Sequence, residues 1–430
     1  MSINFIKLPL MLWVAASCVA CSNDENVASS STQTLENGGS VAVSINLPRI
    51  QSSRANSLPN LDDGSANEYD VNSADIALYA VNGTDTFCVG VEHFTREQLQ
   101  FALSGANNDE TTSVSAVVNV PAHAATPTLA LAILNDADGV NLPVIGDSYS
   151  KFESSPVTAT ATGMKDGFFM MTNSSFAKAD GSVQSLATID PSSISKDSSV
   201  KPTTITQIYV ERVNAKVQLS MPLGAEDTYG SVDASGDMPV ITFSNGDKLK
   251  ITGWDLTVTN KSYFPVKVIG NNAADWNDAT KYQMSTLWTD PIRHRSYWAI
   301  DPNYANVFKG QEGDFYYKSL NDISTSKLSN GNDIKYCLEN TFNADAQNKN
   351  QTTAVIIKGI YTLSNTTEGD DVYRISGTAY KLSDIKTYLA DRLKANGYTV
   401  TAGGDIDAGK IELTNDASTN KITVNYTGGT

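Results

Sequence analysis

The sequence of 430 residues predicts a mainly β protein with two β-sandwich domains and one or two short helices. Short runs rich in β-branched and aromatic residues recur along the chain, and Asn-Gly, Asp-Gly and Ser-Asn-Gly turns separate them. The length allows two or three domains. An apolar fraction of 40% is enough to fill their cores.

The chain begins with a segment typical of an export signal. Lys7 precedes an apolar run from Leu8 to Val19, and small residues then lead to Cys21. Residues 1–21 therefore read as a lipoprotein signal peptide, with Cys21 as the lipid attachment site. The Ser-Asn-Asp-Glu sequence after Cys21 is similar to the tag with which Bacteroidota send lipoproteins to the outer face of the outer membrane. This predicts a location at the cell surface.

An isolated strand pattern follows within residues 22–54, which we interpret as a propeptide. Residues 22–40 are rich in Ser, Asn, Thr and Gly and read as a flexible tether. Apolar and small or polar residues then alternate strictly until Pro48, as expected for a strand buried on one face. Its apolar positions are Val41, Val43, Ile45 and Leu47. A second loose stretch covers residues 50–72.

The body of the chain divides near residues 223–231, where Pro222, Gly224 and Gly230 cluster. This predicts an N-terminal sandwich at residues 55–223 and a C-terminal sandwich at residues 224–430. Strands are expected at 75–81, 114–120, 128–134, 168–172, 205–221, 248–259, 354–362 and 421–426.

Helix signals are few. A helix is expected after Leu382, with Ser383 as its cap and Gly397 as its stop. Ile385, Leu389 and Leu393 share one face of this helix. A weaker helical pattern covers residues 95–103.

Charge and cysteine content limit the partners. With 31 basic and 47 acidic residues the net charge is −16, which disfavours a nucleic acid partner. Only Cys88 and Cys337 lie outside the signal. They could pair in an oxidising compartment, although two buried free thiols are the favoured interpretation.

No motif supports catalysis, so we predict neither an enzyme nor a cofactor or metal site. The segment 404–410 has phosphate-loop spacing, but Ile411 replaces the Ser/Thr, and a hairpin turn fits better. His93, His123 and His294 lack metal-ligand spacing. Residues 134–145 only imitate a calcium loop.

An aromatic stretch offers an alternative function. Trp276, Trp288 and Trp298 are interleaved with tyrosines and aspartates. Ring faces can stack on sugars while carboxylates accept hydroxyl hydrogen bonds, so the chain could be a glycan-binding lipoprotein that stays lipid-anchored and monomeric. The favoured interpretation is that these rings fill a sandwich edge or a domain interface.

Two arginines follow the isolated strand. Between Leu8 and Arg96 the only basic residues are Arg49 and Arg54, so an arginine-directed protease would find a defined target here. Cleavage would leave the strand non-covalently held, and its departure would open a groove for a strand of another chain. The residues alone fit equally well a permanent first strand and an idle Arg54.

The layout resembles the fimbrillins of Bacteroidales (type V pilins), and most closely the short or minor fimbrillin family. The resemblance rests on the signal ending at Cys21, the Val41–Pro48 strand leading to Arg54-Ala55, and four body segments. Those segments are Asn72–Val81, Val210–Val217, Tyr336–Thr341 and Thr353–Gly359.

The resemblance implies two transthyretin-like β-sandwiches, cleavage between Arg54 and Ala55, and polymerisation with other fimbrial subunits by donor-strand exchange, supporting adhesion. It also implies that the groove lies within residues 55–223. Shaft-forming family members continue past the helix and hairpin at 382–426 into further strands. A shortened product, or an accessory or terminal subunit that accepts a strand, would both fit this chain.

Overall fold

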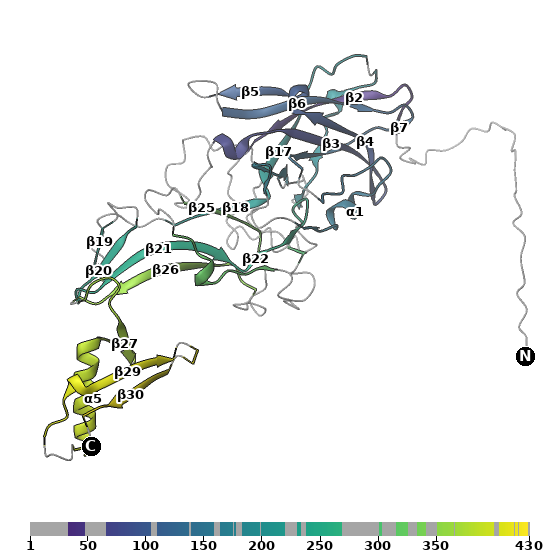
Figure 1. The fold of residues 1–430 in the computed structure, drawn as a ribbon. Helices are drawn as coiled ribbons and strands as arrows, with labels where there is room; N and C mark the ends of the chain where they lie inside the picture. Colours follow the sequence, from purple (N-terminus) through teal and green to yellow (C-terminus); the bar gives the residue numbers. More distant parts are fainter. Residues whose placement is uncertain are drawn as a thin grey trace, which may run out of the picture.

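A computed structural model gives the structure of the protein, which is mainly β as predicted (Figure 1). The described residues are 33–47, 66–104, 110–136, 139–158, 164–174, 176–177, 183–197, 199–219, 230–233, 238–268, 301–302, 315–325, 333–340, 351–364, 366–399, 404–416, 418–419 and 421–428.

The N-terminal part is built on one path of hydrogen-bonded strands in the order β4-β3-β8-β12-β17-β2-β6-β5. These strands are β2 (Gly39–Asn46), β3 (Ser73–Asn82), β4 (Asp85–Thr95), β5 (Gln100–Ser104), β6 (Glu110–Val120), β8 (Leu129–Leu134), β12 (Met171–Asn173) and β17 (Thr206–Arg212). Two further short strands pair with members of this path: β15 (Ala187–Thr188) pairs with β8, and β16 (Ile194–Ser195) pairs with β2. The path folds into two facing layers because β17 changes partner along its length, from β2 at Thr206–Tyr209 to β12 at Val210–Arg212.

The layer containing β3 and β8 is covered on both faces. Along β8, Ala130, Ala132 and Leu134 enter the core shared with β2 and β6, whereas Leu131 and Ile133 enter a second core. The second core contains Phe152 of the helix α1 (Tyr149–Glu153), together with Tyr263, Val266 and Leu338 from later in the chain. The continuous apolar run of β8 reflects this double burial.

A second, smaller unit follows. The sheet β19-β20-β21-β26 is formed by β19 (Gly230–Asp233), β20 (Val240–Phe243), β21 (Lys248–Thr257) and β26 (Ala354–Thr362). It packs through Trp254, Ile251 and Leu256 against Cys337 and Val217 of the pair β18 (Asn214–Gln218) and β25 (Ile334–Leu338). The segment expected as one strand at 205–221 is therefore two, which break at Val213 and pair in different units. The expected boundary at residue 223 lies outside the described residues.

The described residues between 366 and 428 form a separate unit (Figure 1), with a core of its own around Ala390, Ile406 and Ile411. They contain the hairpin β27 (Val372–Ile375) and β28 (Thr378–Lys381), the helix α5 (Leu382–Ala395), and the hairpin β29 (Ile411–Asp416) and β30 (Lys421–Tyr426). The expected helix is present, but Lys381 rather than Ser383 is its N-cap residue. Gly397 ends it as expected, with φ +82° and the Tyr398 amide donating to the Leu393 carbonyl at 3.1 Å.

Three other expectations are corrected. Residues 95–103 form a 3₁₀ turn (Arg96–Gln98) followed by β5, because Phe101 and its neighbours pair with β6. Residues 404–410 are a loop ending in a 3₁₀ turn (Ala408–Lys410) before β29, not the turn of a hairpin. Residues 33–40, expected as tether, begin with β1 (Thr34–Leu35) and lead directly into β2, with Leu35 only 2% exposed.

The remaining described elements are short. β1 pairs with β7 (Ala124–Ala125), β10 (Met164–Lys165) with β11 (Phe168–Phe169), β13 (Phe176–Ala177) with β14 (Val183–Gln184), β22 (Thr259–Asn260) with β24 (Phe315–Tyr316), and β23 (Ser262–Tyr263) with β9 (Val157–Thr158). The other 3₁₀ turns are Ala66–Tyr69, Pro191–Ser193 and Leu320–Asp322.

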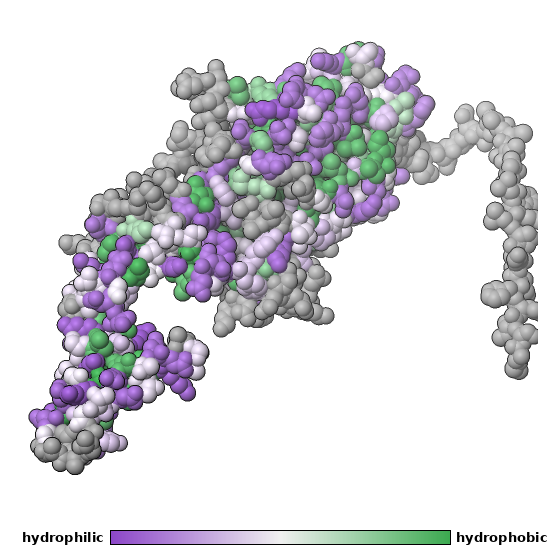
Figure 2. All heavy atoms as spheres, viewed as in Figure 1, coloured by the Kyte–Doolittle hydropathy of each residue, from purple (hydrophilic) through white to green (hydrophobic). Residues whose placement is uncertain are grey.

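The visible surface is a mixture of polar residues and small apolar patches (Figure 2). Apolar exposure is pronounced along β26, where Val355 and Ile357 are each 46% exposed. No helix among the described residues is long and apolar enough to cross a membrane.

Candidate functional site around the strand Gly39–Asn46

The strand β2 lies in the middle of its sheet. Along one edge, all eight of its residues pair antiparallel with β6, from Gly39 opposite Val120 to Asn46 opposite Ser113. Along the other edge, β16 pairs with Ser40 and Val41, and β17 runs parallel to Val43–Asn46. If β2 left, the unpaired backbone groups of two strand edges would be exposed together.

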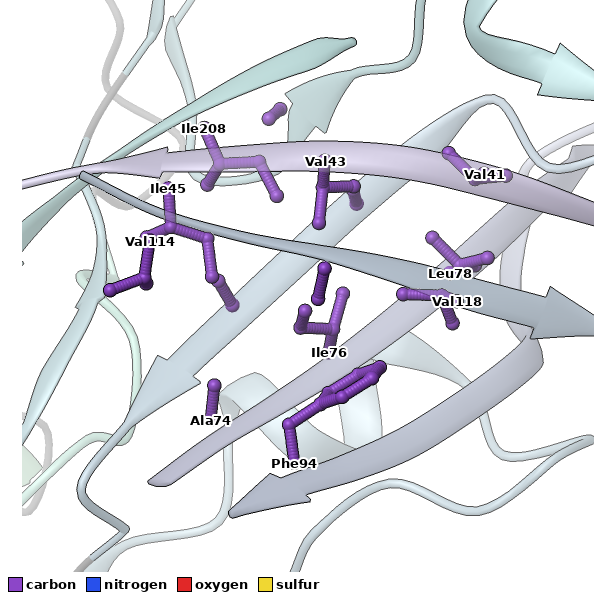
Figure 3. Packing of buried hydrophobic residues seen from close by; sticks show 14 of the residues in the cluster. Val41, Val43, Ile45, Ala74, Ile76, Leu78, Phe94, Val114, Val118 and Ile208 are labelled. Carbon is purple, nitrogen blue, oxygen red and sulfur yellow. The ribbon is translucent and has the colours of Figure 1, made fainter. Parts of the chain in front are cut away.

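The inner face of β2 is part of the main core. Val41, Val43 and Ile45 are fully buried and Leu47 is 3% exposed. The side chains of Val41, Val43 and Ile45 project toward Ile76 and Leu78 of β3, between Val114 and Val118 of β6 and Ile208 of β17 (Figure 3), and Leu47 belongs to the same core. The four apolar residues of the sequence pattern therefore lie together in one continuous core.

The outer face of β2 is buried as well, although a strand exposed to water on one face was expected. Ser40, Ala42 and Ser44 are 1%, 6% and 8% exposed. The connection from β16 to β17 returns past this face, and the Ser40 hydroxyl donates to the Val200 carbonyl at 3.4 Å. We call residues 196–205 the strap; its described residues are 196–197 and 199–205. The β2 residues on this outer face, Ser40, Ala42 and Ser44, all have small side chains.

Hydrogen bonds stabilise the two ends of the strap and a turn within it. The hydroxyls of Ser193 and Thr206 lie 2.5 Å apart, which ties β16 to the start of β17. Within the strap the Ser199 amide and hydroxyl donate to the Asp197 carboxylate at 2.9 and 2.7 Å. These bonds hold the pKa of Asp197 below its ordinary value, the side-chain bond having the larger effect.

Two glycines begin the strand, each for a different reason. Gly38 has φ +73°, in the left-handed region that favours glycine. Gly39 has no room for a side chain, because a Cβ there would lie 2.4 Å from the Ser195 carbonyl oxygen. At the other end, the Asn46 side-chain amide donates to Gln207 at 2.9 Å and the Leu47 amide donates to Thr112 at 3.0 Å.

A buried ion cluster lies directly after the connection from β2. Glu68, in the first described turn beyond residues 48–65, is 3% exposed and faces Arg212 at 2.9 Å and Lys216 at 3.4 Å. The Tyr336 hydroxyl of β25 also bonds to Glu68, and the Arg212 guanidinium stacks over Tyr69 at 5.1 Å. The cluster thus fixes the chain after residue 65 to both the N-terminal sandwich and the second unit.

The structure describes only some of the other residues singled out in the sequence. Cys21, Arg54, Ala55, Trp276, Trp288 and Trp298 lie outside the described residues, as does His294. Cys88 and Cys337 are buried free thiols in separate cores. His93 pairs with Asp75 at 2.8 Å and His123 with Glu36 at 3.3 Å. Within the described ranges, no group of three or more His, Cys, Asp or Glu residues could hold a metal ion.

The central position of β2, its covered outer face and the Glu68 cluster were not predicted from the sequence. The small residues at positions 40, 42 and 44 and the pair Gly38-Gly39 were available signals for the covered face. The parallel pairing with β17 joins residues more than 160 positions apart, and no local pattern predicts it.

No protein-family model and no curated protein sequence matches the chain. Among solved structures, the chain is similar to a fimbrial assembly protein from Parabacteroides distasonis, at 10% identity over 90% of this chain and 100% of that one, with a TM-score of 0.38. A candidate cell adhesion protein from Bacteroides eggerthii shares 12% identity over 80% and 78% of the two chains, with a TM-score of 0.33. At these identities and TM-scores, neither similarity indicates a function for this chain.

Proposed function

We propose that the protein is a non-enzymatic structural or accessory subunit of a surface fimbria that supports adhesion. It is exported as a lipoprotein through Cys21, cleaved between Arg54 and Ala55, and assembled when a strand of another subunit replaces β2. The chain then leaves its lipid anchor with the propeptide and remains at the cell surface in the polymer.

The covalent connection of β2 supports this proposal. The strand pairs on both edges with later parts of the chain, yet only residues 48–65 connect it to them covalently. A single cut after Arg54 therefore turns a central strand into a non-covalently bound peptide that carries the lipid site. In an ordinary sandwich a central strand is connected at both ends and cannot be exchanged.

The energetics favour refilling of the vacated groove. Val41, Val43, Ile45 and Leu47 are buried to 3% exposure or less, and burial of such side chains stabilises by about 1.5–3 kcal/mol each. Their sum is on the order of 6–12 kcal/mol, before the strand's ordering entropy is subtracted. An emptied groove would expose this apolar floor, so another strand of similar pattern would bind strongly.

Intact-mass analysis of the surface form tests the proposal. We expect a mature N-terminus at Ala55 in the wild type, and an uncleaved chain that stays out of polymers in an Arg54→Ala variant. Arg49→Ala is the matched control, since it removes the neighbouring basic residue and should leave processing unchanged. A wild-type surface chain that still begins at lipidated Cys21 would contradict the proposal and favour the anchored glycan-binding alternative.

A further inference from the structure

We infer that the groove selects its incoming strand on both faces, and that it accepts a strand of another subunit in which large apolar residues alternate with Gly, Ala or Ser. The inference rests on the proposed exchange of β2 and names the chemistry of the partner. The apolar face alone would admit many strands; a glycine position at the start of the strand and the covered outer face restrict the choice.

The closest restriction is at the start of the strand, where Gly39, in line with Val41 and Val43 and not with the outer residues, lies against β16. Because the contact of a Cβ at this position would be with a backbone carbonyl 2.4 Å away, no change of rotamer relieves it. Any side chain larger than hydrogen requires β16 to move, and β16 is tied to β17 through the Ser193 and Thr206 hydroxyls. The occupant of this position is therefore glycine.

The second restriction lies on the covered outer face. Ser40 and Ala42 are 1% and 6% exposed, and the Ser40 hydroxyl reaches the strap backbone at Val200. Because Ala42 is buried, a leucine at position 42 would have to displace the atoms that pack against this face. Since a one-residue shift would turn the apolar residues outward, the strand cannot avoid the cover by slipping.

The strand β30 of this chain does not meet that requirement. In β30, Ile422 and Val424 alternate with Lys421, Thr423 and Asn425, all of them exposed. Placed in the groove with its apolar residues inward, β30 would push a lysine, a threonine and an asparagine toward the covered face. A second copy donating β30 is therefore not the occupant that fits; a strand with small residues at those positions is.

The test uses the full chain with a specific protease site in place of residues 50–56. After cleavage, labelled peptides of residues 33–47 compete for the groove, and fluorescence anisotropy measures their incorporation. A second format unfolds the cleaved chain in urea and refolds it with the peptides present, in case the resident strand leaves the folded protein too slowly. We expect the native peptide to enter. Gly39→Val and Ala42→Leu peptides should enter at least tenfold less well. A Glu36→Leu peptide is the control for added bulk, because the Glu36 side chain is 72% exposed.

The outcomes separate the two proposals. Equal incorporation of the Gly39→Val and Ala42→Leu peptides would overturn the small-residue requirement and leave strand exchange intact. Native-like incorporation of a peptide of residues 418–428 would also overturn it, and would identify a second copy as the donor. Failure of the native peptide in both formats would overturn strand exchange itself, and this inference with it.

Discussion

At the scale of single residues, position within the sheet decides what a side chain contributes. Ile45 of β2 is fully buried in the main core, whereas Ile357 of β26 has the same side chain and is 46% exposed. Both belong to strands rich in β-branched apolar residues, so residue type alone does not separate them. Only the layer packed against β2 makes Ile45 a core residue.

Replacing these two isoleucines measures that difference. Ile45→Ala should lower the free energy of unfolding by about 2–5 kcal/mol, because it removes buried methyl groups and leaves a cavity. Ile357→Ala should change it by less than about 1 kcal/mol, since much of that side chain already contacts water. Urea unfolding of the uncleaved chain gives both values. Equal losses would contradict the assignment of β2 to the core.

The acidity of the two thiols outside the signal segment also depends on burial. Burial raises the pKa of the Cys88 and Cys337 thiols to about 11 from an ordinary 9. The folded chain therefore keeps two protons that the unfolded chain releases between pH 9 and 11. The stability this contributes is fully present below pH 9 and is lost as the pH rises toward 11.

Alkylation at pH 8 checks the state of both thiols. In a chain beginning at Ser22, which lacks the two signal cysteines, we expect no labelling of the folded protein. Two labels should be added in guanidinium without reductant, since both thiols are free and inaccessible. Labelling in guanidinium only after reduction would instead show a disulfide.

At the scale of elements, the same chain segment can serve two structures. The continuous run from Thr206 to Gln218 is divided at Val213, with β17 in the N-terminal sandwich and β18 in the second unit. By contrast, α5 follows its local signals closely at its C-terminus. Local signals thus set where this helix ends, and distant partners set where the strands break.

The C-terminus of α5 provides a test at this scale. Gly397→Ala should destabilise the unit of residues 366–428 by roughly 1 kcal/mol, because alanine at φ +82° is strained. Lys394→Ala, in the last turn of the same helix, is the control; it removes an exposed ion pair with Asp405 at 3.6 Å and should change stability by less than about 0.5 kcal/mol. Hydrogen exchange of the α5 amides reports both. An unchanged exchange rate in the glycine variant would show that this unit tolerates another helix end.

At the scale of the whole molecule, the Glu68 cluster connects the segment after residue 65 to both the N-terminal sandwich and the second unit. Its carboxylate contacts Arg212 of β17, Lys216 of β18 and Tyr336 of β25. After a cut at Arg54, Glu68 would hold the new N-terminal segment against both units. The loss of β2 could then open the groove without releasing the chain that follows it.

Removing this carboxylate should be costly. Glu68→Ala removes a buried carboxylate that faces Arg212 and Lys216, which are 8% and 10% exposed, and should destabilise the chain by about 3–5 kcal/mol. The control is Glu368→Ala, which breaks a half-exposed pair with Lys250 and should cost less than about 1 kcal/mol. Urea unfolding of both variants, before and after cleavage, measures the difference. A Glu68 effect no larger than the control would exclude an anchoring role.

The sequence alone determined the mainly β class, the stop of α5 at Gly397 and the alternating pattern of residues 41–47, because turn chemistry and side-chain periodicity are local. Only the tertiary structure decided that β2 is central, that its small outer residues are buried, and that the run expected at 205–221 is divided between two strands. These features depend on the pairing of β2 with β17, more than 160 positions away, on the pairing of β18 with β25, more than 110 positions away, and on burial by elements that no local pattern predicts. The physical reason is that a strand's partner and cover come from elsewhere in the chain.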